Sequence, residues 1–295
     1  MIGLEILVLV LFWTWAVIAY LFLRSTLPPR LPISITPVQL GLPMNTVEFP
    51  ASDGVRIAAW TITRDPGFPW IISCHGLGAN RADLLDIVRG LSAAGFNLLL
   101  FDFRGHGASG GRATSFGWRE QRDLEGALAF LSQHAGLPAR PYGVYGVSMG
   151  AAVGLLVAAR DERIGAVAAD SSYANLHDAL SRHLRLLYPY VPRAVFLPLV
   201  AATYRLRFGV WPHRVAPETA AGQLTNRPIL VIQGGEDPRQ PREDAVRLAA
   251  AAHGELWVID GAAHLGGFGA DARAYGDRLI GFFGQAIGRA VGNSV

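Results

Sequence analysis

A serine flanked by glycines is the first feature of this sequence that could do chemistry. Residues 146–150 read Gly-Val-Ser-Met-Gly, which fits the pattern G-x-S-x-G, and they lie between an apolar run and a small-residue helical pattern. The pentapeptide alone is weak, because chance would supply about 0.2 such matches in this chain. On a sharp strand-to-helix turn, however, the serine hydroxyl projects above the sheet edge, where helix N–H groups favour negative charge. We therefore predict that Ser148 is a nucleophile.

A serine hydroxyl is a poor nucleophile at neutral pH and needs a base to accept its proton. His264 is the leading candidate, because it follows the apolar run 255–260 in the segment GAAHLGGF. The remaining histidines lie on expected helices, in an expected cap or in Gly-rich loops: His75, His106, His134, His177, His183, His213 and His253. We predict that His264 is the base.

The base needs a carboxylate to hold its tautomer and orientation. Asp237 follows the apolar run 228–233, and it gives the chain order serine, acid, histidine. Glu236, its neighbour, and Asp260, at the end of a strand, are alternatives. Acyl transfer also needs donors for an oxyanion, and we expect the backbone N–H groups of Met149 and Leu77 to supply them.

The chain has 295 residues, 51% of them hydrophobic and 17% charged, which suits one large α/β domain or two small ones and excludes a disordered tail. Two apolar-rich segments, 46–52 and 55–63, flank an Asp-Gly turn signal. Six β-rich runs follow at 70–74, 97–102, 142–147, 166–170, 228–233 and 255–260, with helical patterns between most of them at 79–94, 119–134, 150–159 and 241–253. Such alternation predicts a mostly parallel, twisted sheet with helices on both faces.

Two regions depart from this alternation. Nearly sixty residues separate the strands that end at Asp170 and start at Pro228, which predicts an inserted helical cap over about 174–224. At the N-terminus, residues 6–23 contain no charged side chain, so we expect a transmembrane anchor over 1–24. A signal peptide and a helix of a soluble protein are the alternatives.

The segments around this apolar run complete the expected domain organisation. A Pro-rich linker over 25–45 would lead to a soluble α/β domain over 46–295. Arg24 and Arg30 follow the apolar run, so the positive-inside rule favours a cytoplasmic catalytic domain.

Composition excludes several other classes. Cys74 is the only cysteine, so no intramolecular disulfide forms, and its apolar setting favours a packed core thiol over a nucleophile. The 26 basic residues are all arginine and are scattered, which argues against nucleic-acid binding. Spacings typical of zinc ligands are missing, and we expect neither a metal nor a cofactor.

Five ordered motifs together resemble the α/β-hydrolase superfamily: HGLGAN, FDFRGHGASGG, GVSMG, GGEDPRQP and GAAH. The resemblance covers about 46–285 and is strongest to the branch of ABHD-type and serine aminopeptidase-like hydrolases. It implies an α/β-hydrolase fold and two-step acyl transfer through Ser148, His264 and Asp237. Asp102, Arg104, Gly105 and Gly107 match a structural loop of the family, so no catalysis is expected of them.

The expected reaction is hydrolysis of a carboxylic ester or thioester, with a lipid-like or acylated substrate favoured by the apolar cap and the expected anchor. A serine peptidase would use the same residues, but the cap has Asp178 and Glu218 against six arginines, which disfavours recognition of a free α-amine. A non-catalytic scaffold is the third possibility, although all three expected catalytic positions are present. The oligomeric state stays open.

Overall fold

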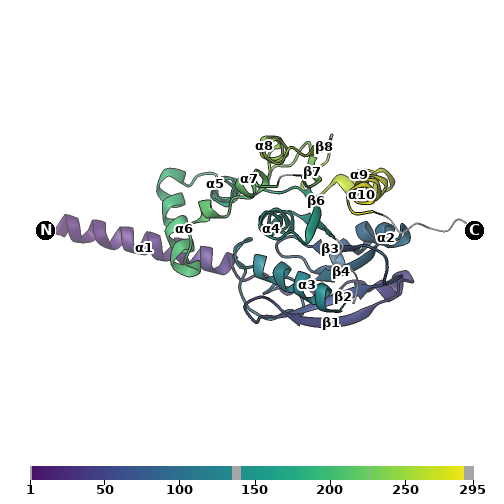
Figure 1. The fold of residues 1–295 in the computed structure, drawn as a ribbon. Helices are drawn as coiled ribbons and strands as arrows, with labels where there is room; N and C mark the ends of the chain where they lie inside the picture. The colour runs from purple at the N-terminus through teal and green to yellow at the C-terminus, as the bar shows by residue number, and fades with distance from the viewer. Residues whose placement is uncertain (1, 135–140, 225, 289–295) are drawn as a thin grey trace, which may run out of the picture.

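A twisted eight-stranded sheet forms the centre of the computed structural model, which describes residues 2–134, 141–224 and 226–288 (Figure 1). Its strands are β1 (Asn45–Pro50), β2 (Arg56–Ile62), β3 (Trp70–Cys74), β4 (Asn97–Phe101), β5 (Tyr142–Val147), β6 (Ile164–Asp170), β7 (Ile229–Gly234) and β8 (Glu255–Ile259). In space their order is β1-β2-β4-β3-β5-β6-β7-β8. Strand β2 runs antiparallel to β1 and β4, and the other pairs are parallel. The expected mostly parallel sheet is therefore confirmed.

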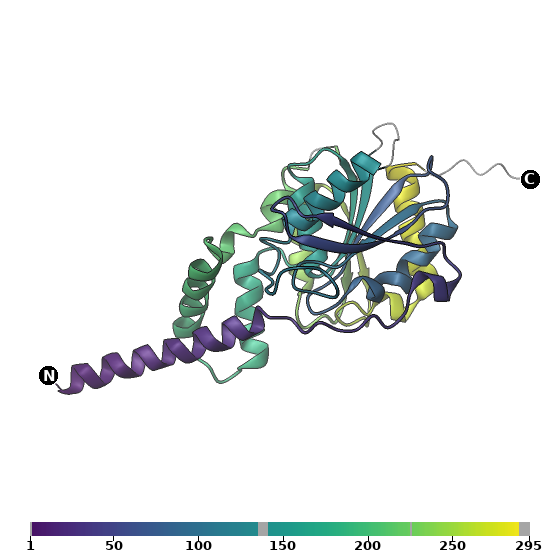
Figure 2. The same cartoon turned by 90° about the horizontal axis from the view of Figure 1, so that it is seen from below.

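Helices cover both faces of the sheet, because alternate side chains of each strand point to opposite sides. On one face, Ile72 of β3 belongs to a core formed with α3 (Gln121–His134), α4 (Met149–Ala158) and α8 (Arg242–Ala252). On the other face, Ile71 belongs to a second core with α2 (Leu85–Ala93) and α10 (Ala272–Ala286). Figure 2 shows the sheet between these two layers.

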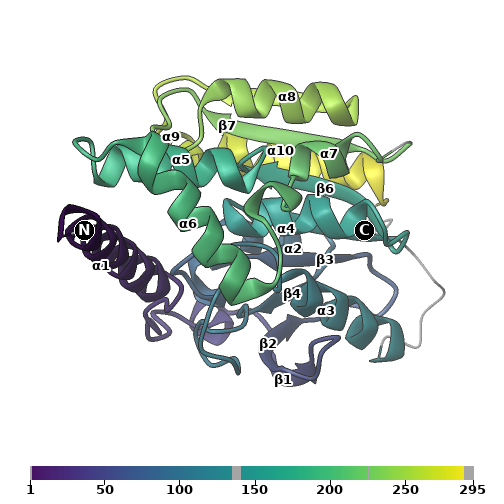
Figure 3. The ribbon, with the colours of Figure 1, turned by 90° about the vertical axis from the view of Figure 1, so that its left-hand side faces the viewer.

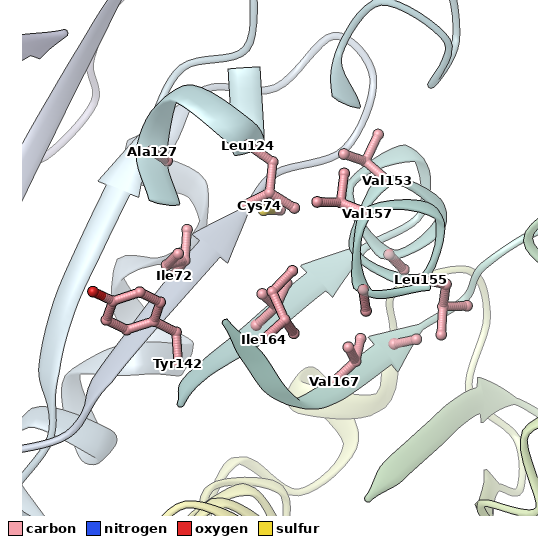
Figure 4. Packing of buried hydrophobic residues seen from close by; sticks show 14 of the residues in the cluster. Ile72, Cys74, Leu124, Ala127, Tyr142, Val153, Leu155, Val157, Ile164 and Val167 are labelled. Atoms are coloured by element: carbon pink, nitrogen blue, oxygen red, sulfur yellow. The ribbon is translucent and has the colours of Figure 1, made fainter. Parts of the chain in front are cut away.

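Cys74 lies inside the first of these cores. Its side chain is fully buried among apolar residues that include Leu124, Val153 and Val157 (Figure 4). Burial raises the pKa of the thiol well above its usual range. The expected packed core thiol is found.

The long insertion between β6 and β7 contains helices, as expected. They are α5 (Leu176–Leu187), α6 (Arg193–Phe208), the 3₁₀ turn η3 (Pro212–Arg214) and α7 (Pro217–Ala221). Helices α5 and α6 stand beyond one end of the sheet, and α7 packs against α4 and α8 (Figure 3). The other short elements are η1 (Pro37–Leu40), η2 (Arg81–Leu84) and α9 (Gly267–Ala270).

The apolar N-terminal run forms one helix, α1 (Ile2–Ser25), whose second half packs on α6 (Figure 3). Trp15 Nε1 donates a hydrogen bond to Thr203 Oγ1 at 3.3 Å, and the buried Phe22 ring meets Tyr204 edge-on. Among the described residues, no helix combines the length and the apolar character that crossing a bilayer requires. The transmembrane helix expected over 1–24 is therefore not found, and the residues toward its end instead contact the cap.

The segment between α1 and β1 is largely extended, as its prolines predict, but it is held against the domain. Arg30 Nη1 donates to the carbonyl oxygens of Gly107 and Ser109, both at 2.7 Å, and its Nη2 donates to that of Gly111 at 2.6 Å. The Thr26 carbonyl oxygen accepts the Thr114 N–H at 2.8 Å. Hydrogen bonds therefore hold this extended segment against the domain.

Close backbone packing at the start of α4 yields a stability prediction. A methyl group on Gly150 would lie 2.1 Å from the carbonyl oxygen of Cys74, so Gly150→Ala must displace main chain. We expect it to lower the free energy of unfolding by about 1–3 kcal/mol. Gly276→Ala in α10 is the control: a methyl there meets nothing within 4 Å, and it should raise stability by about 0.5–1 kcal/mol. Urea unfolding curves measure both; equal effects would contradict the packing argument.

Candidate active site

Ser148 lies in the turn between β5 and α4 with a strained backbone, φ 52° and ψ −113°. Its N–H donates to the carbonyl oxygen of Asp170 at 2.8 Å, which ties the turn to the end of β6. The flanking glycines are needed for space: a Cβ on Gly146 would lie 2.5 Å from the Gly150 oxygen, and neither glycine has a positive φ. The strain is thus borne by the serine itself, and its neighbours allow strand and helix to approach closely.

Ser148, His264 and Asp237 come together at the edge of the sheet where the parallel strands end. His264 Nε2 lies 3.2 Å from Ser148 Oγ, and His264 Nδ1 lies 2.6 Å from Asp237 Oδ2. Asp237 follows β7 and His264 follows β8, so three separate strands deliver the group. With the Nδ1 proton held by the carboxylate, Nε2 is available to accept the serine proton.

The Asp237 carboxylate is surrounded by hydrogen-bond donors. Its Oδ1 accepts the N–H groups of Arg239 at 2.8 Å and Gln240 at 3.0 Å, and Oδ2 accepts Gln233 Nε2 at 3.3 Å in addition to His264. Burial alone would raise its pKa, but the bonds from His264 and these N–H groups outweigh burial and hold the pKa below its usual value. Asp237 is therefore ionised at neutral pH and orients the imidazole.

The structure also places the two alternative acids. Glu236 and Asp260 are exposed, and of the three carboxylates the structure brings only Asp237 to His264. Glu236 contributes its N–H to the Ala262 carbonyl, which joins the acid loop to the histidine loop.

The two expected oxyanion donors lie beside the serine. A Cβ built on Gly76 would contact Ser148 Cβ at 3.5 Å, so the loop after β3 lies against Ser148. Within the described part of the chain, the N–H groups of Leu77 and Met149 have no hydrogen-bond acceptor. Both residues line the same pocket as Ser148, so two N–H groups are available to an oxyanion.

Two buried histidines hold this loop. His106 Nε2 accepts the Gly78 N–H at 3.1 Å, and His75 Nε2 accepts the Phe103 N–H at 2.9 Å. Burial lowers the pKa of both rings, that of His75 to about 3. Each ring is therefore neutral, which leaves Nε2 free to accept. Their role is to position the loop.

The residues assigned to a structural loop make structural contacts. The fully buried Asp102 carboxylate pairs with Arg81 and accepts the Ala108 N–H at 2.8 Å. Arg104 Nη2 pairs with Asp53 and with Asp123, each at 2.7 Å. These ion pairs tie the loop after β4 to η2, to the turn between β1 and β2 and to α3.

Asp170, at the end of β6, has a structural role that the sequence pattern does not predict. Its buried side chain accepts hydrogen bonds from Tyr275 Oη at 2.6 Å and Ser171 Oγ at 2.8 Å. Burial raises its pKa. Its carbonyl holds Ser148, and Ser171 Oγ accepts the Leu265 N–H at 3.4 Å, next to His264. The only sequence signal for this role is an acidic residue at the end of the strand next to β5, which leads into the Ser148 turn.

A pocket of about 710 Å³ opens onto Ser148. Cap residues line it as expected, but α1 lines it too, through residues such as Val17 and Leu21, and sequence reasoning missed this role. Across the residues that the structure describes, no three His, Cys, Asp or Glu side chains gather as metal ligands would.

Comparisons with known proteins agree with this geometry. A family model described as alpha/beta hydrolase fold matches residues 69–210. The uncharacterized protein YqkD of Bacillus subtilis is 30% identical over 222 residues, 73% of this chain and 71% of YqkD. The uncharacterized protein Rv2307c of Mycobacterium tuberculosis is 28% identical over 202 residues, 68% of this chain and 64% of that protein.

Solved structures share the architecture. The esterase Pf2001 of Pyrococcus furiosus superposes with a TM-score of 0.74 at 25% identity, over 88% of this chain and 100% of the esterase. A puromycin-hydrolyzing peptidase of Mycobacterium tuberculosis gives a TM-score of 0.65 at 20% identity, over 84% of this chain and 40% of the peptidase. The second likeness concerns the fold alone. The narrower ABHD-type or aminopeptidase-like branch is not distinguished by these matches.

The buried histidines lead to a pH prediction. The pKa of His75 is about 6.5 in the unfolded chain and about 3 in the folded chain. Between these pH values the unfolded state therefore binds more protons than the folded state. The contribution of neutral His75 to the free energy of unfolding is complete above about pH 6.5. It falls on acidification by up to about 1.4 kcal/mol per pH unit. His75→Asn should reduce that slope between pH 6 and 4, as measured by urea unfolding. An unchanged slope would mean that His75 is not held neutral.

Proposed function

Because this chain belongs to the α/β-hydrolase family, we propose that it is a serine hydrolase that cleaves carboxylic esters or thioesters. The observation that carries the proposal is the continuous contact from Asp237 through His264 to the strained Ser148. Family membership alone would not suffice, since one fold hosts many functions.

In the first step, Ser148 Oγ attacks the substrate carbonyl carbon while His264 Nε2 accepts the hydroxyl proton. The negative charge that develops on the carbonyl oxygen is stabilised by the N–H groups of Leu77 and Met149 and by the N-terminus of α4. Collapse of this intermediate breaks the bond to the alcohol or thiol, which receives the proton from His264. An acyl group then remains on Ser148.

In the second step, water attacks the acyl group. His264 accepts a proton from the water, the same N–H groups stabilise the second oxyanion, and the acid leaves as the proton returns to Ser148 Oγ. Asp237 stays ionised throughout and stabilises the imidazolium. The sequence of steps uses no cofactor.

The lining of the pocket supports esters over peptides. No Asp or Glu is among the described residues that line it, so it offers no carboxylate to a free α-amine. The likeness to the Pyrococcus furiosus esterase at 25% identity points the same way. A peptidase and a non-catalytic scaffold are the outcomes that the experiments below would reveal.

Contact of α1 with a lipid surface is a separate part of the proposal, and it requires no membrane span. Its support is the number of large apolar side chains on α1 that are more than half exposed and do not line the pocket: Ile6, Leu9, Val10, Phe12 and Tyr20. Contiguous apolar surface of this kind is typical of interaction sites. A cytoplasmic position of the domain stays a prediction from two arginines, one of which, Arg30, binds main-chain carbonyls.

The catalytic assignment predicts covalent labelling at one residue. A fluorophosphonate probe should label the wild type, and Ser148→Ala should abolish both labelling and hydrolysis of p-nitrophenyl acetate. Ser132→Ala changes an exposed residue of α3 that does not line the pocket, so it is the control and should behave as wild type. A folded wild type that neither labels nor hydrolyses any ester would favour the scaffold, and one that cleaves only aminoacyl anilides would favour the peptidase.

Substitutions of the adjacent residues Asp237 and Glu236 test which of the two carboxylates is the catalytic acid. Asp237→Asn leaves His264 without its anionic partner, so kcat should fall on the order of 10⁴-fold. Glu236→Gln changes an exposed side chain and should leave kcat within about twofold. Steady-state hydrolysis of p-nitrophenyl acetate measures both; the reverse ranking would refute Asp237 as the catalytic acid.

Lipid contact predicts cosedimentation of the full chain with phosphatidylcholine vesicles. Leu9→Glu combined with Phe12→Glu places charges on the exposed apolar face of α1 and should lower the bound fraction at least tenfold. Leu206→Glu on α6, where the leucine is 72% exposed, is the control and should bind like wild type. Absence of wild-type binding, or equal loss in the control, would refute the contact.

A further inference from the structure

The pocket that opens onto Ser148 has walls that come from outside the sheet. Its volume of about 710 Å³ lies in the range of roughly 300–1,000 Å³ that is typical of sites for small organic ligands. Ser148 and Leu77 lie at its catalytic end, and helices α1, α5 and α6 supply most of the remaining lining. Figures 1 and 3 show these three helices together at one end of the molecule.

Helix α1 contributes one continuous face to the pocket. Trp13, Val17 and Leu21 line it at a spacing of four residues, so they lie on successive turns of the same side of the helix. The adjacent face is anchored: Ile18 and Phe22 are each 6% exposed, and they belong to a cluster with Tyr204 of α6. The helix that carries the lining is therefore fixed to the cap.

The facing wall has the same chemistry. Leu180, Leu184 and Leu187 of α5 line the pocket at helical spacing, and Phe196 and Val200 of α6 close it between the other two helices. Of the described residues that line it, none is Asp, Glu or Arg, and His183 is the only histidine among them. An apolar, uncharged group held here would lose water contact on several sides.

We propose that α1 is a wall of the acyl-binding site and that the enzyme prefers esters with medium to long, unbranched acyl chains. This inference rests on the proposed function, because it places the acyl carbonyl at Ser148 and the chain between α1, α5 and α6. An apolar chain gains about 0.8 kcal/mol per buried methylene, which corresponds to about fourfold in kcat/KM for each carbon that the pocket accepts. The N-terminal helix is then part of substrate selection.

The test uses the full chain and p-nitrophenyl esters with acyl groups of two to sixteen carbons. Wild-type kcat/KM should rise about fourfold per methylene up to the length that fills the pocket. Leu21→Trp adds bulk to the α1 wall and should move the optimum to shorter chains, with at least a tenfold loss for the longest ester and less than threefold for the acetate. Leu184→Trp on the facing wall should do the same.

Each variant has a matched control on the same helix. Leu23 and Leu186 are 38% and 45% exposed and do not line the pocket, so Leu23→Trp and Leu186→Trp should keep the wild-type profile. Leu21 is itself 45% exposed, so its tryptophan variant can fold, and the rate of fluorophosphonate labelling verifies an intact Ser148. If Leu21→Trp does not label, the opposite change, Leu21→Ala, should extend the profile to longer chains.

The outcomes separate this inference from the proposed function. Hydrolysis of acetate with no gain from longer chains, or a profile that Leu21 and Leu184 variants leave unchanged, overturns the acyl site and leaves the hydrolase intact. Failure to hydrolyse any ester, acetate included, overturns the proposed function itself. A shift of the optimum in the pocket variants alone supports the role of α1.

Discussion

The left-handed backbone of Ser148 is the constraint on which the site depends. A non-glycine residue at φ 52° and ψ −113° costs about 1–3 kcal/mol, and it persists only where surrounding structure over-determines it. Here β5 and α4 are buried on every side, Gly146 and Gly150 allow their main chains to touch, and the Asp170 carbonyl fixes the serine N–H. The core thus maintains a geometry that the turn alone would not adopt.

The same construction extends from the serine to the groups around it. The loops after β3, β5, β7 and β8 bring the proposed oxyanion donors, nucleophile, acid and base to one edge, and each of these loops is held by hydrogen bonds. Because these contacts are made before any substrate arrives, the donors need no reorganisation when charge develops. Neutral His75 and His106 suit this purpose, since a charged ring would lose the acceptor that holds the loop.

Local patterns accounted for much of this arrangement. Strands β3 and β5 occupy the predicted ranges 70–74 and 142–147, because buried parallel strands are nearly continuous uncharged, mostly apolar runs. Chain order was enough to bring Ser148, Asp237 and His264 to one edge, since parallel strands end on the same side. Asp170 and Arg30 escaped prediction because their partners lie far away in sequence, and only the folded topology brings them together.

Helix α1 shows where hydropathy stops being informative. An uncharged run of 18 residues indicates that moving the segment out of water is favourable. The free energy of transfer is favourable whether the new surroundings are lipid, a protein core or an apolar ligand, so hydropathy does not distinguish them. In the structure, Ile18 and Phe22 are buried in a cluster with the cap at the edge of the pocket, and the more exposed Val17 and Leu21 line the same pocket. Which α1 side chains are buried depends on where α6 lies, and the sequence of α1 alone carries no information about that. The apolar character of α1 therefore predicts contact with other apolar groups, and the tertiary structure determines which groups these are.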